Sequence, residues 1–368
     1  MSTSPVTVRV NLPQRAYDLL IGHGLLHGLG RQVALRCPAM RAAIVTDSNV
    51  GPLYLDAAIQ SLQAAGIAAT QIVVPTGEAS KSLNQLSELL DVLASHHHAR
   101  DEPIIALGGG VVGDLAGFAA AIWLRGVPFV QCPTSLEAMI DASVGGKTGI
   151  NQTAGKNLIG AFYQPRLVCI DPACLSTLSP RDYTAALAES VKHAVIADPA
   201  FLAWHEAHVQ DLRAQQAETV CALIERNCRI KARYVEKDER EEAEKGVGRA
   251  ALNFGHTIGH AIEAVSSYSL RHGEAVSLGM IVALDLSVRG CGLSDVNRCR
   301  VEALLAVLGL PVKCAVPLDM DELRARLGAD KKVRDQRVRF VVTPKLGETD
   351  WLIEPNEADL RAAIDRLR

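Results

Sequence analysis

The chain has 368 residues, of which 48% are hydrophobic and 21% charged, and its formal net charge is −3. This composition is typical of a folded globular protein and excludes a disordered chain, and the small net charge gives no electrostatic reason to expect nucleic acid or a membrane surface as a partner. A chain of this length exceeds one comfortable hydrophobic core, so we expect two domains.

Short apolar segments alternate with helical segments through the first half of the chain. The expected strands cover residues 6–10, 16–21, 42–46, 71–74, 103–107, 129–132 and 167–170. The expected helices cover residues 53–65 and 83–95, and a third, Ala-rich helix begins at Gly113. Because strands that alternate with helices form parallel sheets with helices on their faces, this half predicts an α/β domain.

The pattern changes after Pro180, where helical segments follow one another directly. They cover residues 184–197, 201–210, 218–236, 254–265, 274–288, 295–308 and 320–326. Apart from one expected strand at 338–343, this half is all-α. Asp-Pro and Ser-Pro steps within residues 171–180 indicate the boundary, so we expect domains at 1–178 and 179–368.

A glycine-rich turn, residues 108–110, follows the buried strand at 103–107 and precedes the helix that begins at Gly113. Glycines let the backbone approach a phosphate, and a helix N-terminus favours its negative charge. A tight corner between strand and helix is the alternative. Asp47 follows an earlier strand and could hold a ribose hydroxyl, although it could equally be a helix N-cap.

A second polar segment, residues 133–135 and 141–157, is rich in Gly, Ser and Thr, and we interpret it as a loop that follows a strand. It carries Lys147, Lys156 and Asn157, whose cationic and amide groups suit a phosphorylated or carboxylated ligand. Solvated surface lysines are the alternative.

His256 and His260 lie four residues apart in an expected helix and therefore share a face. Imidazoles are common zinc ligands, so the pair could bind a metal, whereas two surface histidines at coincidental spacing are the alternative. Gly255 and Gly259 each cost helix stability, about 1 kcal/mol relative to Ala, so a close-packed neighbour should compensate.

Further metal donors lie elsewhere in the second half. His272 falls in a turn-like segment, and Glu189 on an expected helix could complete a Glu/His/His set with open positions. Lys192, one turn from Glu189, could reach a substrate. A surface pair of Glu189 and Lys192 is the alternative.

Seven segments that contain these or similar residues occur together in the chain, in the order given below. They are residues 77–81 (GEASK), 108–118 (GGGVVGDLAGF), 141–151 (DASVGGKTGIN), 155–162 (GKNLIGAF), 188–192 (AESVK), 253–260 (NFGHTIGH) and 272–276 (HGEAV). In this combination the chain resembles the 3-dehydroquinate synthases, which belong to the sugar phosphate cyclases and act in the shikimate pathway of aromatic amino acid biosynthesis. The resemblance covers essentially the whole chain.

The resemblance implies a Rossmann-like NAD-binding α/β domain, an all-α metal-binding domain and a homodimer with its active sites between the domains. It implies one divalent ion, zinc or cobalt, on Glu189, His256 and His272. The implied NAD contacts are Asp47, Asn49, Glu78, Lys81, Gly109, Gly110, Val111, Asp114, Thr134, Ser135, Lys147, Lys156 and Thr177. The implied substrate contacts are Arg125, Asp141, Lys147, Asn157, Lys192, Lys231, Arg249, Asn253, His260, Lys331 and Lys332, and Lys147, Asn157, Lys192, Arg249, Asn253 and His260 would act in catalysis.

Resemblance and spacing disagree about His260, because spacing pairs it with His256 while the family pattern gives it to the substrate. We follow the family pattern, since Glu189 and His272 otherwise lack a role. Arg125 would reach the neighbouring subunit's site. Two departures from the pattern are Glu137, in place of an apolar residue, and about four additional residues at 241–248.

The implied reaction converts 3-deoxy-D-arabino-heptulosonate 7-phosphate to 3-dehydroquinate and phosphate, with transient oxidation by NAD, elimination of phosphate, reduction, ring opening and an intramolecular aldol closure. Three alternatives stay open: a cyclase for a heptulose phosphate without a carboxylate, a metal-dependent polyol dehydrogenase, and an NAD-binding regulatory protein. Nine scattered cysteines and the absence of a secretory signal pattern or an 18-residue apolar run predict a cytoplasmic protein with reduced thiols.

Overall fold

The computed structural model describes residues 5–13, 15–153, 155–243, 246–266, 269–318, 320–328 and 338–368. The chain forms two compact units, one of residues 1–178 with 224–236, and one of residues 179–223 with 237–368. The break after Leu178 falls where the sequence pattern changes. Residues 224–236, which we assigned to the second domain from sequence, group with the first unit.

A seven-stranded, mostly parallel sheet forms the centre of the first unit, in the order β1-β2-β9-β6-β5-β3-β4. Its strands are β1 (Val6–Val10), β2 (Tyr17–Ile21), β3 (Arg41–Asp47), β4 (Ala68–Val74), β5 (Ile104–Gly108), β6 (Phe129–Pro133) and β9 (Leu167–Ile170). Only the β1–β2 pair is antiparallel among these strands. The expected strands are confirmed to within three residues at each end.

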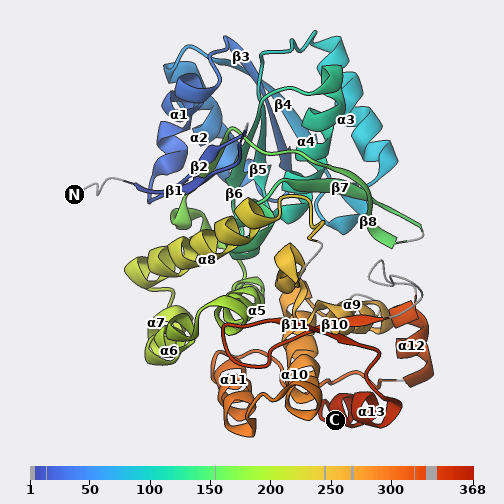
Figure 1. Cartoon of the computed structure of the whole chain (residues 1–368). Coiled ribbons are helices and arrows are strands. Elements are labelled where there is room, and N and C mark those ends of the chain that lie inside the picture. Colours follow the sequence, from blue (N-terminus) through green and yellow to red (C-terminus); the bar gives the residue numbers. More distant parts are fainter. Residues whose placement is uncertain are drawn as a thin grey trace. The chain divides into compact units, whose positions relative to one another are not determined.

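Helices cover both faces of this sheet. They are α1 (Leu29–Arg36), α2 (Gly51–Ala64), α3 (Leu83–Ser95) and α4 (Gly110–Ile122). Side chains of α1 and α2 pack with Ile44 and Leu107 on one face, whereas α3 and α4 pack with Val45 and Ala106 on the other. The two pairs of helices lie on opposite sides of the sheet in Figure 1. Because both faces are buried, β5 is apolar along its whole length, as expected for a central parallel strand.

Two elements of the first unit differ from the sequence-based expectation. The polar segment that we interpreted as a loop contains an antiparallel hairpin, β7 (Lys147–Gln152) and β8 (Gly155–Phe162). Helix α4 begins at Gly110, three residues earlier than expected, because Gly109 is extended and serves as its N-cap. The remaining 3₁₀ and π turns of this unit are η1 (Leu25–Gly28), η2 (Glu78–Ser80), η3 (Trp123–Arg125), η4 (Ala138–Ala142) and η5 (Pro172–Thr177).

The second unit is mainly helical. Its elements are α5 (Pro180–Ala197), α6 (Pro199–Ala207), α7 (Val209–Arg213), the start of α8 (Ala217–Lys237), η6 (Gly248–Asn253), α9 (His256–Val265), α10 (His272–Cys291), α11 (Asp295–Val307), α12 (Met320–Gly328), β10 (Arg339–Val342), β11 (Asp350–Ile353) and α13 (Glu357–Asp365). The expectation of an all-α domain with one strand missed the antiparallel partner β11. Helix α5 starts where the sequence directs it, since Ser179 accepts a hydrogen bond from the amide of Asp182 and Pro180 occupies the first turn.

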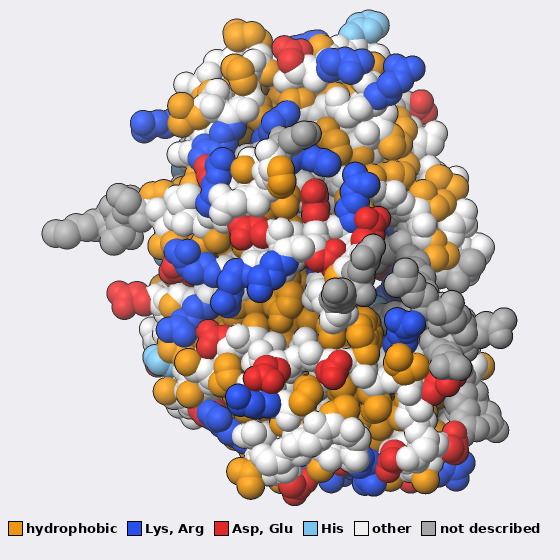
Figure 2. Space-filling model, in the orientation of Figure 1, with side chains coloured by type: hydrophobic (Ala, Val, Ile, Leu, Met, Phe, Trp, Pro, Cys, Tyr) orange, Lys and Arg blue, Asp and Glu red, His pale blue; other side chains and the backbone are white. Residues whose placement is uncertain are grey.

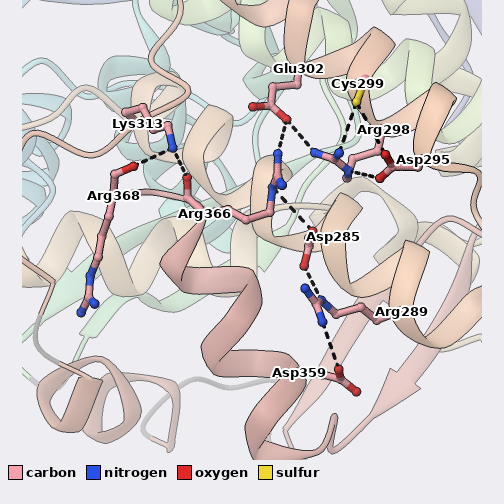
Figure 3. A network of polar contacts seen from close by, with 10 residues as sticks. All are labelled: Asp285, Arg289, Asp295, Arg298, Cys299, Glu302, Lys313, Asp359, Arg366 and Arg368. Carbon is pink, nitrogen blue, oxygen red and sulfur yellow. Dashed lines mark hydrogen bonds and ion pairs between the residues drawn. The ribbon is translucent and has the colours of Figure 1, made fainter.

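Charged side chains fasten α13 to α10 and α11. Arg366 lies 2.8 Å from Glu302 on α11 and 3.5 Å from Asp285 on α10, and Arg289 joins Asp285 to Asp359 at 2.5 and 3.5 Å (Figure 3). Because these charges are shared among several partners, the contacts form a network rather than isolated surface pairs.

The surface and the thiols agree with the composition. On the visible face, basic and acidic side chains are interspersed with apolar ones (Figure 2). Within the described residues no helix is long and apolar enough to cross a membrane. All nine cysteines are free thiols, as expected.

Candidate functional site

The proposed nucleotide residues of the first unit gather at the carboxyl ends of neighbouring strands. Strands β4 and β5 pair with opposite sides of β3, so the order of the sheet reverses there. Loops that leave a parallel sheet at such a point diverge and leave room for a ligand. Asp47 ends β3, Gly109 and Gly110 follow β5, and the amide of Thr134 after β6 donates to the carbonyl of Gly108 at 3.0 Å. Val111 follows in the first turn of α4.

Asp47 closes a local turn between β3 and α2, in addition to any role in binding. Its Oδ1 accepts hydrogen bonds from the amides of Asn49 at 2.8 Å and Val50 at 3.0 Å, just before α2. The N-cap of α2 is Val50, so the alternative that Asp47 is the helix N-cap is wrong, and Oδ2 is the oxygen that could hold a ribose hydroxyl. The side-chain amide of Asn49 donates to the hydroxyl of Thr76 at 3.2 Å. This hydrogen bond holds the segment after β3 beside the segment after β4.

Lys81 connects the α4 start to the β7–β8 hairpin. Its ammonium, only 4% exposed, donates to Asp114 Oδ2 at 2.6 Å and to Asn157 Oδ1 at 2.5 Å. Burial raises the pKa of the Asp114 carboxyl, and the charge of Lys81 opposes that rise. Asn157 has a left-handed backbone (φ 54°), and its main-chain amide donates to the side-chain oxygen of Asn151 at 2.9 Å. Glu78 accepts from Asn151 at 2.8 Å.

The other proposed contacts of the first unit lie on β7, on β8 and in the segments that follow β6 and β9. Lys147 is exposed at the start of β7, and Lys156 is half-buried in β8. Ser135 accepts from the amide of Ala138, and the Thr177 hydroxyl lies 2.6 Å from that of Tyr54.

Asp141, which is half-buried, and Lys231, which is buried, form an ion pair. Lys231, on α8, contacts the carbonyl and the carboxylate of Asp141 at 2.6 and 2.8 Å. Asp141 lies in the π-helical turn η4, a wide turn that is often found at functional sites. The structure therefore joins two residues 90 positions apart that the family pattern assigns to the substrate.

Arg125 is exposed in a strained segment. Leu124 and Arg125 have φ of 47° and 67°, a conformation that costs non-glycine residues free energy. The surrounding fold must hold this turn in place.

In the second unit Glu189, His256 and His272 converge. Glu189 Oε1 lies 3.4 Å from His256 Nε2 and 3.6 Å from His272 Nε2. Tetrahedral ligands at roughly 2.0–2.1 Å from zinc are separated by about 3.3–3.4 Å, so these donors fit one divalent ion with little movement. Glu189 is 1% exposed and His256 8%, which keeps the donors in a mostly dry environment.

The second nitrogen of each imidazole has its own acceptor. His256 Nδ1 lies 3.2 Å from the carbonyl of Phe254, and His272 Nδ1 lies 3.3 Å from Glu263 Oε2. Because a carbonyl or carboxylate accepts, each Nδ1 can donate its proton there, and each Nε2 would then be available as the donor to a metal ion.

Glycines let the three helices approach closely enough for this convergence. A Cβ at Gly273 would lie 1.8 Å from the carbonyl oxygen of Ala185 on α5, and one at Gly279 would lie 1.9 Å from that of Gly255. A Cβ at Gly259 would meet the carbonyl of Ala275 at 3.1 Å. The expected close-packed neighbour of Gly255 and Gly259 is thus confirmed as α10, although Gly255 is the left-handed N-cap of α9 rather than part of it.

The proposed substrate residues of the second unit lie on α5, η6 and α9, and two of them contact the donor set. Lys192 donates to Glu189 Oε2, whereas Oε1 is the oxygen nearest the two histidines. His260 is exposed, and its ring centroid lies 5.3 Å from that of His256. Arg249 is 1% exposed, with its guanidinium 2.5 Å from the carbonyl of Glu239.

Two acidic residues near the site were not found from the sequence. Glu241, in the segment with additional residues, accepts from the Asn253 amide at 2.7 Å. Glu263 contacts His272, as described above, and the only sequence signal for it is its spacing of seven from His256 on one helix face. Lys331 and Lys332 lie outside the described residues.

Comparisons with known proteins agree with the sequence resemblance. Residues 71–185 match the 3-dehydroquinate synthase N-terminal family model, and residues 186–333 match its C-terminal counterpart. The 3-dehydroquinate synthase of Rhodospirillum rubrum is 47% identical over 98% of this chain and 93% of that protein.

Solved structures with the same fold include two synthases of other compounds. A 2-epi-5-epi-valiolone synthase from Streptomyces hygroscopicus, with NAD⁺ and Zn²⁺ bound, is 27% identical with a TM-score of 0.86 over 97% of this chain and 98% of that one. A 2-deoxy-scyllo-inosose synthase complexed with carbaglucose-6-phosphate, NAD⁺ and Co²⁺ has a TM-score of 0.89 over 98% and 99% of the chains, and at 24% identity this likeness concerns the fold alone.

Proposed function

The chain belongs to the 3-dehydroquinate synthase family and has 3-dehydroquinate synthase activity, and we propose that it performs this activity with one NAD and one divalent metal ion. The reaction, a step of the shikimate pathway, is a carbon–oxygen lyase reaction that eliminates phosphate from 3-deoxy-D-arabino-heptulosonate 7-phosphate. The observation that carries the metal proposal is the convergence of Glu189 Oε1 with His256 Nε2 and His272 Nε2.

The donor chemistry supports zinc or cobalt. One carboxylate and two imidazoles with open positions are typical of a catalytic divalent site, and both metals accept this mixture of ligands. When bound, the metal ion would lower the pKa of a substrate hydroxyl, and NAD would accept and return a hydride. The proposed NAD residues are those at the ends of β3, β5 and β6 together with Lys81 and Asp114.

The chain's own residues would bind and neutralise an anionic substrate. Lys192 and Arg249 supply fixed positive charge, which suits carboxylate and phosphate groups. Asn253 supplies an amide, and the exposed imidazole of His260 can exchange a proton with a bound hydroxyl. In the first unit, Lys147, Asn157 and the Asp141–Lys231 pair supply further polar groups. Because Lys192 already donates to Glu189, it also limits the negative charge that this carboxylate would present to the substrate.

The test is inorganic phosphate release from 3-deoxy-D-arabino-heptulosonate 7-phosphate, with and without a chelator and added NAD. We expect release that stops with chelator, returns with zinc or cobalt, and produces no net NADH. Accumulation of NADH with a polyol would favour a dehydrogenase. Release only from a heptulose phosphate that lacks the carboxylate would favour a different cyclase.

We further propose a homodimer in which Arg125 acts in the neighbouring subunit's site. Its support is the exposed, strained turn at Leu124 and Arg125, since strain of this kind is often kept where a side chain must be presented. The test mixes Arg125→Ala and His272→Ala chains after mild dissociation. If Arg125 serves the neighbour, mixed dimers contain one complete site and about a quarter of the activity returns by random pairing. If it serves its own subunit, the mixture stays inactive.

A further inference from the structure

Glu263 is a buried carboxylate on the metal-binding helix α9. It is 5% exposed, and its Oε2 lies 3.3 Å from His272 Nδ1. Acidic side chains are rarely buried to this degree, because removal of the charge from water costs free energy unless a partner compensates. The position of Glu263 beside a proposed metal ligand therefore calls for an explanation other than packing.

One face of α9 places three functional groups in a row. His256, His260 and Glu263 follow at spacings of four and three residues, so all three point the same way. Glu263 reaches the ring of His272 from the side opposite Glu189, since the two carboxylates contact different nitrogens of that ring. His272 thus lies between two carboxylates on two different helices.

We propose that Glu263 is a positioning residue that fixes the proton and the orientation of His272 for metal binding. The inference rests on the proposed metal site. As an acceptor, Glu263 holds the proton of His272 on Nδ1 and leaves Nε2 as the donor toward Glu189 and the ion. A carboxylate partner also makes the imidazole a more basic ligand than the carbonyl partner of His256 does.

His272 has particular need of such support. Each of the two histidines is the first residue of its helix, but 28% of the His272 side chain is exposed, whereas the side chain of His256 is 11% exposed. A ring with more solvent around it has more freedom to rotate, so a second contact restricts it at a point where packing does less.

A competing use of the same residues is a second cation site. His260, Glu263 and His272 also have donor atoms within 4.8 Å of one another. Such a site would need His272 Nδ1 as a ligand. If Nε2 bound the first ion at the same time, the ring would have to lose both protons, which is unfavourable near neutral pH. The positioning role requires no such loss.

The experiment measures metal affinity rather than activity. Zinc-free wild-type, Glu263→Leu, Glu263→Gln and Glu302→Gln proteins are titrated with zinc in competition with a chromophoric chelator, and with cobalt while its visible absorption is recorded. We expect affinity to fall about 10- to 100-fold in Glu263→Leu and less in Glu263→Gln, whose amide oxygen can still accept from Nδ1. The cobalt spectrum should change in the same order. Glu302→Gln removes a carboxylate of the same unit that contacts Arg298 and Arg366, and it should leave both readouts unchanged.

Circular dichroism of the metal-free proteins separates positioning from folding, and Glu263→Gln is the deciding variant if Glu263→Leu does not fold. Affinity and spectrum equal to wild type in a folded Glu263 variant would overturn the inference. Two ions per wild-type chain, falling to one in Glu263→Gln, would also overturn it in favour of the second site. Failure of the underlying metal proposal gives a different result, namely that His272→Ala binds one ion as tightly as wild type.

Discussion

A methyl group at Gly273 should open the metal site without touching any proposed ligand. In Gly273→Ala the new Cβ would lie 1.8 Å from the carbonyl oxygen of Ala185, whereas real Cβ contacts stay above 3.0 Å, so the start of α10 must move from α5 by about 1.2 Å. Ala185 and Glu189 lie one turn apart on α5, and His272 precedes Gly273. The same movement therefore widens the 3.6 Å gap between Glu189 Oε1 and His272 Nε2.

The expected magnitudes follow from that displacement. Overpacking of this kind typically costs about 1–3 kcal/mol of folding free energy. Metal sites tolerate distance changes of only about 0.2 Å, so we expect zinc affinity to fall by at least roughly tenfold, or about 1.4 kcal/mol. Phosphate release at limiting zinc should fall in proportion, and excess zinc should restore part of it.

The matched control is Gly290→Ala in the same helix. Its Cβ would meet Leu352 at 3.4 and 3.6 Å, which is ordinary contact, and the exchange should stabilise α10 by up to about 1 kcal/mol. Both variants are compared with wild type by thermal unfolding without metal and by zinc competition. If Gly273→Ala holds zinc as tightly as Gly290→Ala, the close approach of α5 and α10 does not set the site geometry, and the reasoning is wrong.

Three further predictions use other parts of the chain. His272→Ala should abolish zinc binding and phosphate release while the far-ultraviolet circular dichroism stays unchanged; one tightly bound zinc per chain would contradict the ligand assignment. Burial alone would raise the pKa of Asp18, but its hydrogen bonds and ion pairs with Arg9 and Arg36 outweigh burial and lower the pKa. The Asp18 carboxylate therefore stabilises the fold at pH values above its pKa in the unfolded chain, and this stabilisation is lost as the pH falls through its lower pKa in the folded protein. Wild type should therefore exceed Asp18→Asn by about 0.5–1 kcal/mol in urea unfolding near pH 7 and by less near pH 3, and an equal difference at both pH values would refute it. The exposed thiol of Cys299 should react with a chromogenic disulfide within minutes, whereas Cys228, whose pKa burial raises to about 12, should react only on unfolding; rapid labelling of Cys228 in the folded protein would show that the core opens.

Periodicity predicted most elements of the fold because their burial is one-sided or complete. Strand β5 is an unbroken apolar run, and α3 begins at a Ser82 cap that local sequence reveals. The sequence did not predict the β7–β8 hairpin, because the pairing of these strands depends on glycines rather than on alternating apolar residues. At Gly149 and Gly160 a Cβ would come within 2.6 and 2.1 Å of the opposite strand's backbone. Such residues carry no β signal of their own.

The candidate site was predictable as a set of residues but not as an arrangement. The residues alone offered Glu189 and the histidines as metal donors, and the family pattern then chose Glu189, His256 and His272 over the spacing-based pair of His256 and His260. The sequence did not identify Glu263 as a residue of the site, because an acidic residue on an amphipathic helix normally faces water. Nothing in the sequence shows that this carboxylate is buried. Only the contact of α9 with α10 reveals its partner.

The contacts at Gly255, Gly259, Gly273 and Gly279 place main chain against main chain, so the spacing of the metal donors does not depend on how neighbouring apolar side chains fill the core. Libraries that seek a new sugar substrate can therefore vary the residues that line His260 and Lys192 widely. The same libraries should hold these four positions constant, because a single carbon atom at Gly273 or Gly279 would alter the framework that every variant has to share.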